Sequence, residues 1–538
     1  MEKYFGKSVS KGIAIGKISF FKRPDGVIKE AEIDDTEAEI NRFQIARHKA
    51  IEEQEKLYEK AVKEAGEETA AVFEVHAMML DDDDLVDSIK SIIEDEHKNA
   101  EFAVKIACEK QSEVFAELDD PYFKERSADI IDIGQCVIDA LTGVTINFEI
   151  NQENTILVAD DLSPSDTVRL DKSKLAGFIT YKGSSNSHTA ILARNMNIPA
   201  IVKSDVIDSN LEGATAIIDG YESVVYVNPS NEVYEKLKFK SDAEAESKAR
   251  LQSLMGKETV TKSGKVIHLY ANMGSPDDLR MVKTNDAEGI GLFRSEFLYL
   301  NSSDYPDEET QFKAYKSVLE EMSPRKVIIR TCDIGADKKV DYMNLEPEDN
   351  PALGFRAIRI CLQRKDFFKT QLRAILKASV YGNLGIMFPM IISVDELNAS
   401  IDILEECKRE LKDKGIPYSD SIEIGSMIET PAAVLIADEL ADRCDFFSIG
   451  TNDLTQYICA IDRQNVNLES VLDTHHPAVL KAIKMTIDAG HRHNCWVGIC
   501  GELASDESLT NEFVKMGVDE LSVSPGFILS LRNTICGI

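Results

Sequence analysis

One histidine in the N-terminal half, His188, has neighbours that suit it to carry a phosphoryl group. It lies in a compact loop of glycine and small polar residues, 183–189, just before the helix-forming residues 190–194. The exposed amides and the dipole of a helix N-terminus favour an anion, and a neutral imidazole is a competent phosphoryl nucleophile. A lone histidine near a helix start is more often a surface or capping residue, so this loop alone leaves both interpretations open.

A second set of chemically capable side chains lies in the C-terminal half, where most members closely follow a short apolar run. Guanidinium groups bind phosphate and carboxylate, paired carboxylates bind a hard divalent cation, and a thiol can give a proton to carbon. Any single member could be a salt bridge, a cap or, for the thiol, a small buried hydrophobe. Of the seven residues in this set, six closely follow such runs and Arg463 lies a little beyond one, which favours a shared site. The residues are Arg294, Arg330, Glu429, Asn452, Asp453, Arg463 and Cys500.

The elements that would position this second set are eight apolar runs, most of them separated by gaps long enough for a helix. This layout predicts a (β/α)8 barrel, in which residues after the strands meet at the C-terminal face. A doubly wound open sheet is the alternative, which strand count alone does not exclude. The runs lie at residues 266–270, 289–293, 327–329, 385–388, 422–427, 446–449, 496–499 and 521–523.

The N-terminal half has a different pattern. A glycine-flanked strand near residue 15 is followed by a long stretch with apolar residues at helical spacing and no proline between Pro24 and Pro121. Strand-like runs then alternate with short helical stretches, as in an α/β domain. We therefore predict an α/β multidomain protein. Its parts are an α/β domain with His188 (1–29 and 142–227), an inserted helical subdomain (30–141), a linker helix (228–260) and the barrel (261–538).

Composition narrows the class of protein. The net charge of −33 argues against binding to nucleic acid, because a phosphate backbone would be repelled. No apolar run is long enough to cross a bilayer, and the N-terminus has no apolar signal region. The ten cysteines have no regular spacing, which favours free thiols in a reducing cytosol. We expect a cytoplasmic protein without a membrane or nucleic-acid partner.

The residues around His188 also carry a resemblance. The strings GSSNSHTAILAR (183–194) and RNMNIPAIV (194–202) resemble the phosphohistidine motif of a group that includes enzyme I of the sugar phosphotransferase system, pyruvate phosphate dikinase and phosphoenolpyruvate synthase. The chain departs from the motif in having Gly-Ser for Gly-Gly and Asn-Ser-His for Thr-Ser-His. The resemblance implies that His188 is the phosphoryl carrier and that Thr167 hydrogen-bonds its imidazole.

The barrel segment is more closely similar to enzyme I. The strings are GIGLFRSEFL (289–298), RTCDIGADK (330–338), NPALGFRAIR (350–359), GTNDLTQY (450–457) and GICGEL (498–503). They imply that Cys500 gives a proton to the enolate of pyruvate and that the metal is Mg²⁺, bound by Glu429 and Asp453. They also imply that phosphoenolpyruvate is held by Arg294, Arg330, Arg356, Asn452, Asp453 and Arg463.

A stretch of the helical insert resembles the enzyme I subdomain that binds the phosphocarrier protein HPr. It is GEETAAVFEVHAMML (66–80), followed by four aspartates. A methionine-rich apolar stripe edged by carboxylates would attract a basic, partly apolar surface. Periodicity alone fits an ordinary core stripe equally well. The residues that the resemblance assigns to the partner are Glu67, Glu68, Ala71, Met78, Met79 and Leu85.

The resemblance covers nearly the whole chain and implies a phosphoenolpyruvate–protein phosphotransferase. Such an enzyme passes the phosphoryl group through His188 to a histidine of HPr and releases pyruvate, in the first step of bacterial sugar uptake. A dikinase or synthase would need an ATP-grasp domain before His188, and a non-catalytic regulatory relic is a further alternative. Enzyme I dimerises through its barrel and usually continues past residue 538. We therefore expect thin cover over the last strand, from Phe527, Ile528, Leu529 and Leu531. We also expect a homodimer through the barrel that is either weaker than usual or has the partner subunit covering this gap.

Overall fold

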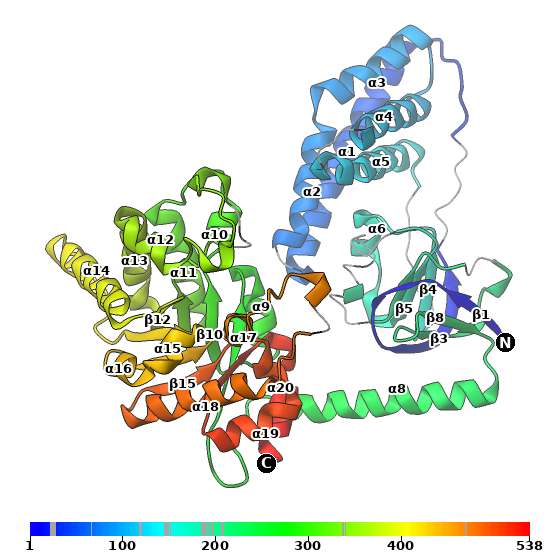
Figure 1. Cartoon of the computed structure of the whole chain (residues 1–538). Coiled ribbons are helices and arrows are strands. Elements are labelled where there is room, and N and C mark those ends of the chain that lie inside the picture. Colours follow the sequence, from blue (N-terminus) through cyan, green and yellow to red (C-terminus); the bar gives the residue numbers. More distant parts are fainter. Residues whose placement is uncertain are drawn as a thin grey trace. The chain divides into compact units, whose positions relative to one another are not determined.

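The structure is a computed structural model, and it divides into two compact units, Met1–Ser247 and Lys248–Ile538 (Figure 1). It describes all residues except 22–27, 66, 118–120, 145–149, 151, 184–189, 191–192, 195–197, 206–208, 336–337, 339 and 469–470. The side chains of some flanking residues, including 63–69, are also outside the description. Among the described residues, every helix is too short or too polar to cross a membrane.

The first unit contains a mixed sheet of eight strands in its described part, in the order β1-β8-β7-β3-β4-β5-β6-β2. The strands β3 to β6 run parallel to their neighbours in that series, and the other pairs are antiparallel. The strands are β1 (Glu2–Phe5), β2 (Lys7–Ser10), β3 (Ile13–Phe20), β4 (Thr155–Ala159), β5 (Leu175–Thr180), β6 (Ala200–Val202), β7 (Thr215–Asp219) and β8 (Val224–Val227). The short helix α6 (Pro164–Arg169) follows β4, and α8 (Asn231–Gln252) follows β8.

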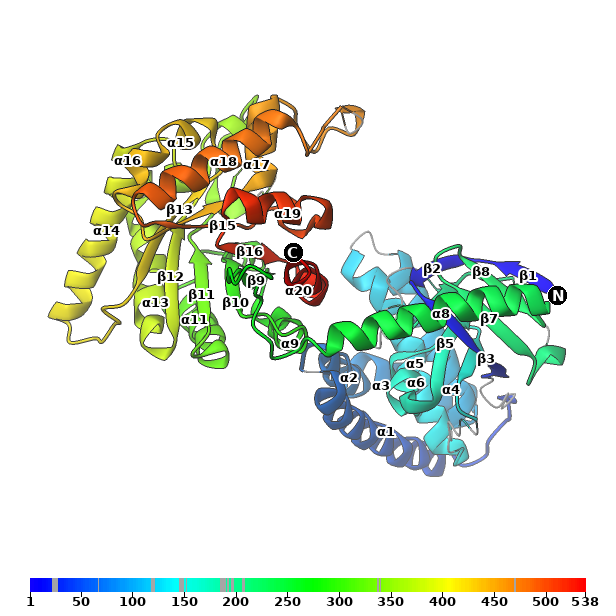
Figure 2. The same cartoon turned by 90° about the horizontal axis from the view of Figure 1, so that it is seen from below.

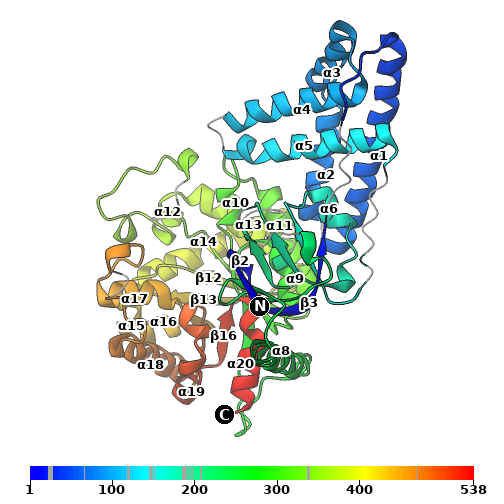
Figure 3. The ribbon, with the colours of Figure 1, turned by 90° about the vertical axis from the view of Figure 1, so that its right-hand side faces the viewer.

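Between β3 and β4 the chain forms an all-helical insert, as the proline-free stretch predicts. Its helices are α1 (Thr36–Ala65), α2 (Glu67–Leu80), α3 (Asp83–Glu96), α4 (Ala100–Glu117) and α5 (Pro121–Thr142). The helices α4 and α5 lie side by side (Figure 3). Phe43, Ala46 and Ala50 of α1 are buried against α3, α4 and α5, so the apolar spacing read from the sequence marks the inner face of α1.

The second unit is a closed barrel of eight strands, each parallel to both neighbours, in the order β9 to β16 (Figure 2). The predicted (β/α)8 barrel is therefore confirmed, and closure excludes the open-sheet alternative. Each predicted run overlaps one strand. The strands are β9 (His268–Met273), β10 (Gly289–Arg294), β11 (Lys326–Arg330), β12 (Asn383–Phe388), β13 (Glu423–Ile428), β14 (Phe446–Ile449), β15 (Trp496–Ile499) and β16 (Glu520–Val523).

Helices surround the barrel strands and bury the main hydrophobic core against them (Figure 2). Amphipathic helices such as α13 and α14 place their apolar residues inward and their charged residues outward. The helices are α9 (Leu279–Thr284), α10 (Phe297–Leu300), α11 (Glu308–Met322), α12 (Ile358–Gln363), α13 (Lys365–Ala378), α14 (Val394–Asp413), α15 (Pro431–Leu435), α16 (Ala437–Ala441), α17 (Thr451–Cys459), α18 (Pro477–Arg492), α19 (Glu507–Met516) and α20 (Ile528–Cys536).

The residues after β16 are more deeply buried than we expected from the sequence. Helix α20 buries Ile528, Leu531 and Ile535 in the barrel core. On the same helix Arg532 is fully buried, and its guanidinium forms ion pairs with Asp286 and Glu288 near the start of β10. It also donates hydrogen bonds to the Thr259 hydroxyl and to backbone carbonyls. The expected thin cover over the last strand is therefore wrong, because apolar packing and a buried cation both fix α20.

We predict that Arg532→Ala destabilises the barrel by about 3 kcal/mol or more, because it removes the buried cation from two largely buried carboxylates, whose other partners Arg325 and His268 are exposed and farther away. The matched control is Arg492→Ala, which removes an exposed arginine that also pairs with an aspartate, and it should have a much smaller effect. Trp496, the only tryptophan, stacks on Phe446 inside the barrel, so its fluorescence during urea unfolding reports on this unit alone. Equal losses for the two variants would contradict a structural role for Arg532.

Candidate active site at the carboxyl ends of the barrel strands

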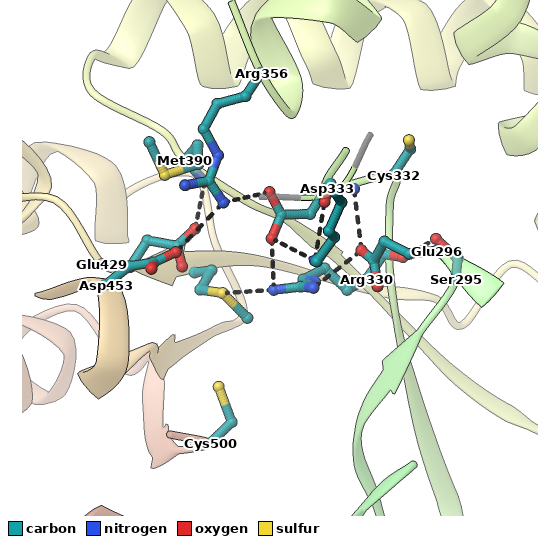
Figure 4. Close-up of polar contacts among 12 residues, drawn as sticks. Ser295, Glu296, Arg330, Cys332, Asp333, Arg356, Met390, Glu429, Asp453 and Cys500 are labelled. Carbon is teal, nitrogen blue, oxygen red and sulfur yellow. Dashed lines mark hydrogen bonds and ion pairs between the residues drawn. The ribbon is translucent and has the colours of Figure 1, made fainter. Parts of the chain in front are cut away.

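The candidate residues lie where the barrel strands end. Arg294 and Arg330 are the last residues of β10 and β11 and are paired in register. Glu429 directly follows β13, Asp453 lies in the first turn of α17 after β14, and Cys500 directly follows β15. Because parallel strands end at the same rim, most of these side chains meet there (Figure 4).

At the centre of this rim Asp333 lies between two arginines. Its Oδ2 is 3.0 Å from Nη1 of Arg330, and its Oδ1 is 2.9 Å from Nη2 of Arg356 (Figure 4). All three side chains are buried. Burial alone would raise the pKa of Asp333, but the charges of Arg330, Arg356 and Lys338 hold it well below its usual range. One permanent negative charge therefore fixes two guanidinium groups.

A second buried carboxylate, Glu296, orients Arg330 from the other side. Its Oε1 is 2.9 Å from Nη2 of Arg330 and accepts a 3.0 Å hydrogen bond from the backbone amide of Asp333. Burial would lower the pKa of Arg330, but Glu296 and Asp333 raise it far above its usual value. Arg330 therefore carries a permanent charge whose direction the fold determines.

Behind the arginines a chain of neutral hydrogen bonds holds the backbone that carries them. The Ser295 hydroxyl donates to the carbonyl of Arg330 (2.8 Å), and the Gln371 side chain donates to that hydroxyl (2.9 Å). The same Gln371 accepts from the amide of Cys332 (2.9 Å) and donates to the Tyr315 hydroxyl (3.1 Å). These groups are buried, so the backbone directly after Arg330 is fixed on both sides of Thr331.

On the opposite side of Arg356 lie the two carboxylates Glu429 and Asp453. Arg356 Nη2 is 3.4 Å from Asp453 Oδ2, and the amide of Met390 donates to Glu429 Oε1 at 2.7 Å. Burial, together with the charges of Asp453 and Asp333, raises the pKa of Glu429 to about 8. This corner of the site therefore has more carboxylate than the nearby cations neutralise.

Such a donor set fits a hard divalent cation. Mg²⁺ is usually bound by one or two carboxylates and completes its coordination with water and substrate phosphate. Within the described part of the chain, no three His, Cys, Asp or Glu side chains gather closely enough to form a metal cage by themselves. A cation held by Glu429 and Asp453 would therefore need ligands from substrate and water.

The remaining polar residues lie at the edge of the site. Asn452 exchanges two hydrogen bonds with Glu502: its amide donates to Oε1 (3.0 Å), and the Glu502 amide donates to Asn452 Oδ1 (2.9 Å). Arg463 is about one third exposed, with Nη2 at 3.6 Å from Asp453 Oδ1. Arg294 is exposed and makes no ion pair among the described residues. Arg294 and Arg463 at the rim are therefore held by fewer contacts than the buried Arg330 and Arg356.

Cys500 lies below the charged groups, at the top of the barrel interior (Figure 4). It is buried among Leu292, Ile328, Met387, Met427 and Phe446. Burial is the main reason that its pKa is raised to about 12. The thiol therefore keeps its proton at neutral pH, so Cys500 is suited to act as an acid and not as a nucleophile.

In the first unit the structure describes only part of the predicted set. His188 and the side chains of Glu67 and Glu68 lie outside the described residues. Thr167 donates its hydroxyl hydrogen to the carbonyl of Pro164 (2.7 Å), so toward an imidazole it could act only as an acceptor.

The other predicted partner residues lie on α2 and α3 of the helical insert. Ala71 and Met78 are exposed, Met78 by 74%. Met79 and the buried Leu85 line a cavity of about 190 Å³, together with Phe115, Ile133 and Arg126. This cavity combines apolar walls with a charged group, and Met78 is not among the residues that line it.

Comparison with known proteins agrees with this architecture. The PEP-binding domain of PEP-utilising enzymes matches residues 248–538, their N-terminal domain matches 5–126, and their mobile domain matches 151–223, which includes position 188. The phosphoenolpyruvate-protein phosphotransferase of Bacillus subtilis is 43% identical over 537 residues, covering 99% of this chain and 94% of its own. That of Geobacillus stearothermophilus is 44% identical over 98% of this chain and 92% of its own.

The chain belongs to the phosphoenolpyruvate–protein phosphotransferase family. The resemblance to enzyme I is thereby confirmed over nearly the full length of the chain. A solution structure of an enzyme I N-terminal fragment is 37% identical and covers 45% of this chain and 99% of its own, with a TM-score of 0.40.

Several functional groups of this rim were missed in the sequence. Asp333, Glu296 and Ser295 stand inside strings that carried the resemblance, but no role followed from their type alone. Asp333 lies three residues after Arg330, a spacing that could have indicated an ion pair next to a strand end. No sequence pattern indicated a role for Gln371, because its partners Cys332 and Ser295 are 39 and 76 residues away.

We predict that iodoacetamide modifies Cys500 about a thousandfold more slowly in the folded protein than in urea-unfolded protein at pH 8. Only the thiolate reacts, and a pKa of about 12 leaves a very small thiolate fraction compared with an ordinary cysteine. Peptide mass spectrometry with timed quenching measures the rate, with the half-buried Cys536 as internal reference. Fast labelling of Cys500 in the folded chain would show that the site stabilises its thiolate.

Proposed function

We propose that the chain transfers the phosphoryl group of phosphoenolpyruvate to His188 and from there to a histidine of HPr, with release of pyruvate. This is the first step of the sugar phosphotransferase system. The observation that carries the proposal is the buried arrangement of Arg330, Asp333 and Arg356 beside the two carboxylates, in a chain of this family. This arrangement would place an anion site next to a metal site, with Arg356 contacting residues of both.

Substrate binding is assigned to the cations at the strand ends. The permanent charges of Arg330 and Arg356 are already oriented by Asp333 and Glu296, so they can meet phosphate oxygens without reorganising. The exposed Arg294, with Arg463 and Asn452, would close on the substrate from the rim. Asp453 would take part through Arg356 and Arg463.

The proposed metal is Mg²⁺, held by Glu429 and Asp453. When bound, the ion would neutralise charge on the transferring phosphoryl group. Glu429 must be a carboxylate to bind it, so with a pKa of about 8 this residue gives up a proton when the site is loaded near neutral pH.

Cys500 is assigned the final proton transfer. Once the phosphoryl group has left, the enolate of pyruvate is a strong base at carbon, and the S–H proton of Cys500 forms the new C–H bond of the methyl group. A raised pKa suits this task, because the thiol then keeps its proton until the enolate appears.

The domain division predicted from the sequence is consistent with this phosphoryl transfer. The α/β domain of residues 1–29 and 142–227 would carry His188 between the barrel (261–538) and the partner, with the helical subdomain (30–141) as docking surface and residues 228–260 as linker. The match of residues 151–223 to a mobile domain supports movement of the carrier.

HPr docking is assigned to the helical insert. The exposed Met78 and the neighbouring cavity offer apolar contacts, and the aspartates at 81–84 would attract a basic surface. Glu67, Glu68, Ala71, Met79 and Leu85 complete the proposed surface. We further propose a homodimer formed through the barrel and a cytoplasmic location in a bacterial cell.

We predict that the protein takes up about one equivalent of acid-labile phosphate from labelled phosphoenolpyruvate and Mg²⁺, without ATP. His188→Ala should abolish labelling, because the carrier nitrogen is gone, and removal of the metal by EDTA should do the same. The control is His475→Ala, which removes an exposed histidine paired with Asp506 on the barrel and should label normally. Acid-labile label in the His188 variant, or a need for ATP, would contradict the proposal.

A further inference from the structure

The backbone that carries Cys500 is held by a side chain with no role so far, that of Asn272 in β9. Its Nδ2 atom donates hydrogen bonds to the backbone carbonyls of Cys500 (3.0 Å) and of Ser522 (3.1 Å). Two carbonyl oxygens at these distances require a donor, so the nitrogen of the amide and not its oxygen faces them. One side-chain amide therefore connects β9, the end of β16 and the residue after β15.

Cys500 needs such a contact because both strand ladders end one residue before it. The last residue of β15 that pairs with its neighbours is Ile499, opposite Ile449 of β14 and Leu521 of β16. On the β14 side the amide of Cys500 still donates to the carbonyl of Ile449 (3.1 Å). On the β16 side the bond comes from Asn272, so the Cys500 backbone is held from both sides.

The Asn272 side chain points into the barrel interior, because Ala271 and Met273 are buried in the core outside the strands and side chains alternate along a strand. Its Oδ1 atom is buried there and has no hydrogen-bond partner among the described residues. An unpaired buried acceptor costs stability, so packing alone would not favour an asparagine at this position. The donating half of the amide, which contacts Cys500, accounts for it.

The direction of the thiol follows from this backbone. A cysteine has one rotatable bond between its backbone and its sulfur, and that bond prefers staggered positions. The Sγ atom of Cys500 lies 3.7 Å from the Ile449 carbonyl, among apolar side chains. A proton donor must lie within reach of the atom that it protonates, and a displacement of about 1 Å can slow a reaction about a hundredfold. Holding the Cys500 carbonyl therefore controls where the thiol can deliver its proton.

The far end of the segment after β15 is fixed independently of Asn272. Asn452 and Glu502 exchange two hydrogen bonds there. A β-carbon on Gly501 would lie 2.0 Å from Oγ1 of Thr451, so this loop packs tightly on the loop after β14. Loss of the Asn272 contact would therefore loosen the residue that carries the thiol and leave Asn452, on the proposed substrate side, in place.

The buried acid on the same strands, Glu520 of β16, is bound elsewhere. Its carboxyl accepts a hydrogen bond from the Ser522 hydroxyl. It also fills the space next to Gly498, where a β-carbon would lie 1.9 Å from Oε2 of Glu520. Among the described residues its carboxyl makes no hydrogen bond to the Cys500 backbone, so the hold on that backbone from this side comes from Asn272.

We propose that Asn272 is a positioning residue for proton transfer, which holds the Cys500 backbone so that the thiol meets one face of the enolate. The inference rests on the proposed function, in which the S–H bond of Cys500 breaks and its proton forms the new C–H bond of pyruvate. The enolate is planar, so a fixed donor reaches a single face, whereas protonation by water occurs on both faces. Asn272 thus acts through Cys500 and does not touch the substrate.

The test measures which face of the enolate is protonated. One turnover of (Z)-3-fluorophosphoenolpyruvate with stoichiometric enzyme and Mg²⁺ in deuterium oxide gives fluoropyruvate with one hydrogen and one deuterium at C3. Immediate reduction by lactate dehydrogenase preserves that configuration for fluorine NMR. The wild type should give one diastereomer. Asn272→Asp, which has the same size but turns an oxygen toward the two carbonyls, should give both. Its exchange of pyruvate methyl protons with deuterium oxide should fall at least tenfold.

Two further variants keep the test decisive. Asn272→Leu removes the donor without adding a charge, so it should also give both diastereomers, with an unchanged KM for phosphoenolpyruvate. The matched control, Asn285→Asp, alters an exposed amide that donates to the carbonyl of Met281, and it should give one diastereomer.

One diastereomer from Asn272→Leu would overturn the inference, and so would barrels that no longer fold by Trp496 fluorescence, since Asn272 would then be structural. Both diastereomers from the wild type would instead contradict the proposed role of Cys500. A wild-type chain that is not phosphorylated would contradict the proposed function as a whole.

Discussion

The site depends on one buried carboxylate, Asp333, placed between two guanidinium groups. Arg330 and Arg356 would repel each other in a low-dielectric interior, and each would pay a large desolvation penalty without a counter-charge. Asp333 removes both problems, because it pairs with both guanidinium groups at once. Because Arg356 also reaches Asp453, Asp333 is connected through Arg356 to the proposed metal ligands. A change at Asp333 should therefore disturb both the arginines and these ligands.

Much of this arrangement could be predicted from the sequence, and the limit has a physical cause. Short apolar runs mark buried strands, and a polar residue just after such a run lies at the rim of a closed barrel, so Arg330 and Glu429 could be placed. The residues that orient these side chains could not be predicted. Glu296 follows the neighbouring strand β10, and Gln371 lies on α13, 41 residues after Arg330; they meet Arg330 or its neighbours only once these strands and helices have packed together. Glu520 gave no signal, because an acid in a strand is expected to face solvent.

Burial raises the pKa of three groups in the barrel, with a different consequence for each. It keeps the proton on Cys500, which the proposed function assigns to meet the enolate, and on Glu520 of β16. It also raises the pKa of Glu429 to about 8, where binding of a cation can remove the proton. These three groups belong to three different strand–helix units, so the closed barrel sets their relative positions. In the proposed function, His188 then needs only to reach this rim, because the charges there are already fixed.

The most direct test of this account measures phosphoenolpyruvate binding to a barrel without the central charge. In a His188→Ala background, which prevents turnover, isothermal titration in Mg²⁺ compares chains with and without Asp333→Asn. The account predicts that the substitution weakens binding at least tenfold, about 1.4 kcal/mol, while Trp496 fluorescence shows an intact barrel. Unchanged or tighter binding would contradict it, since the two arginines would then hold the substrate without the carboxylate that orients them.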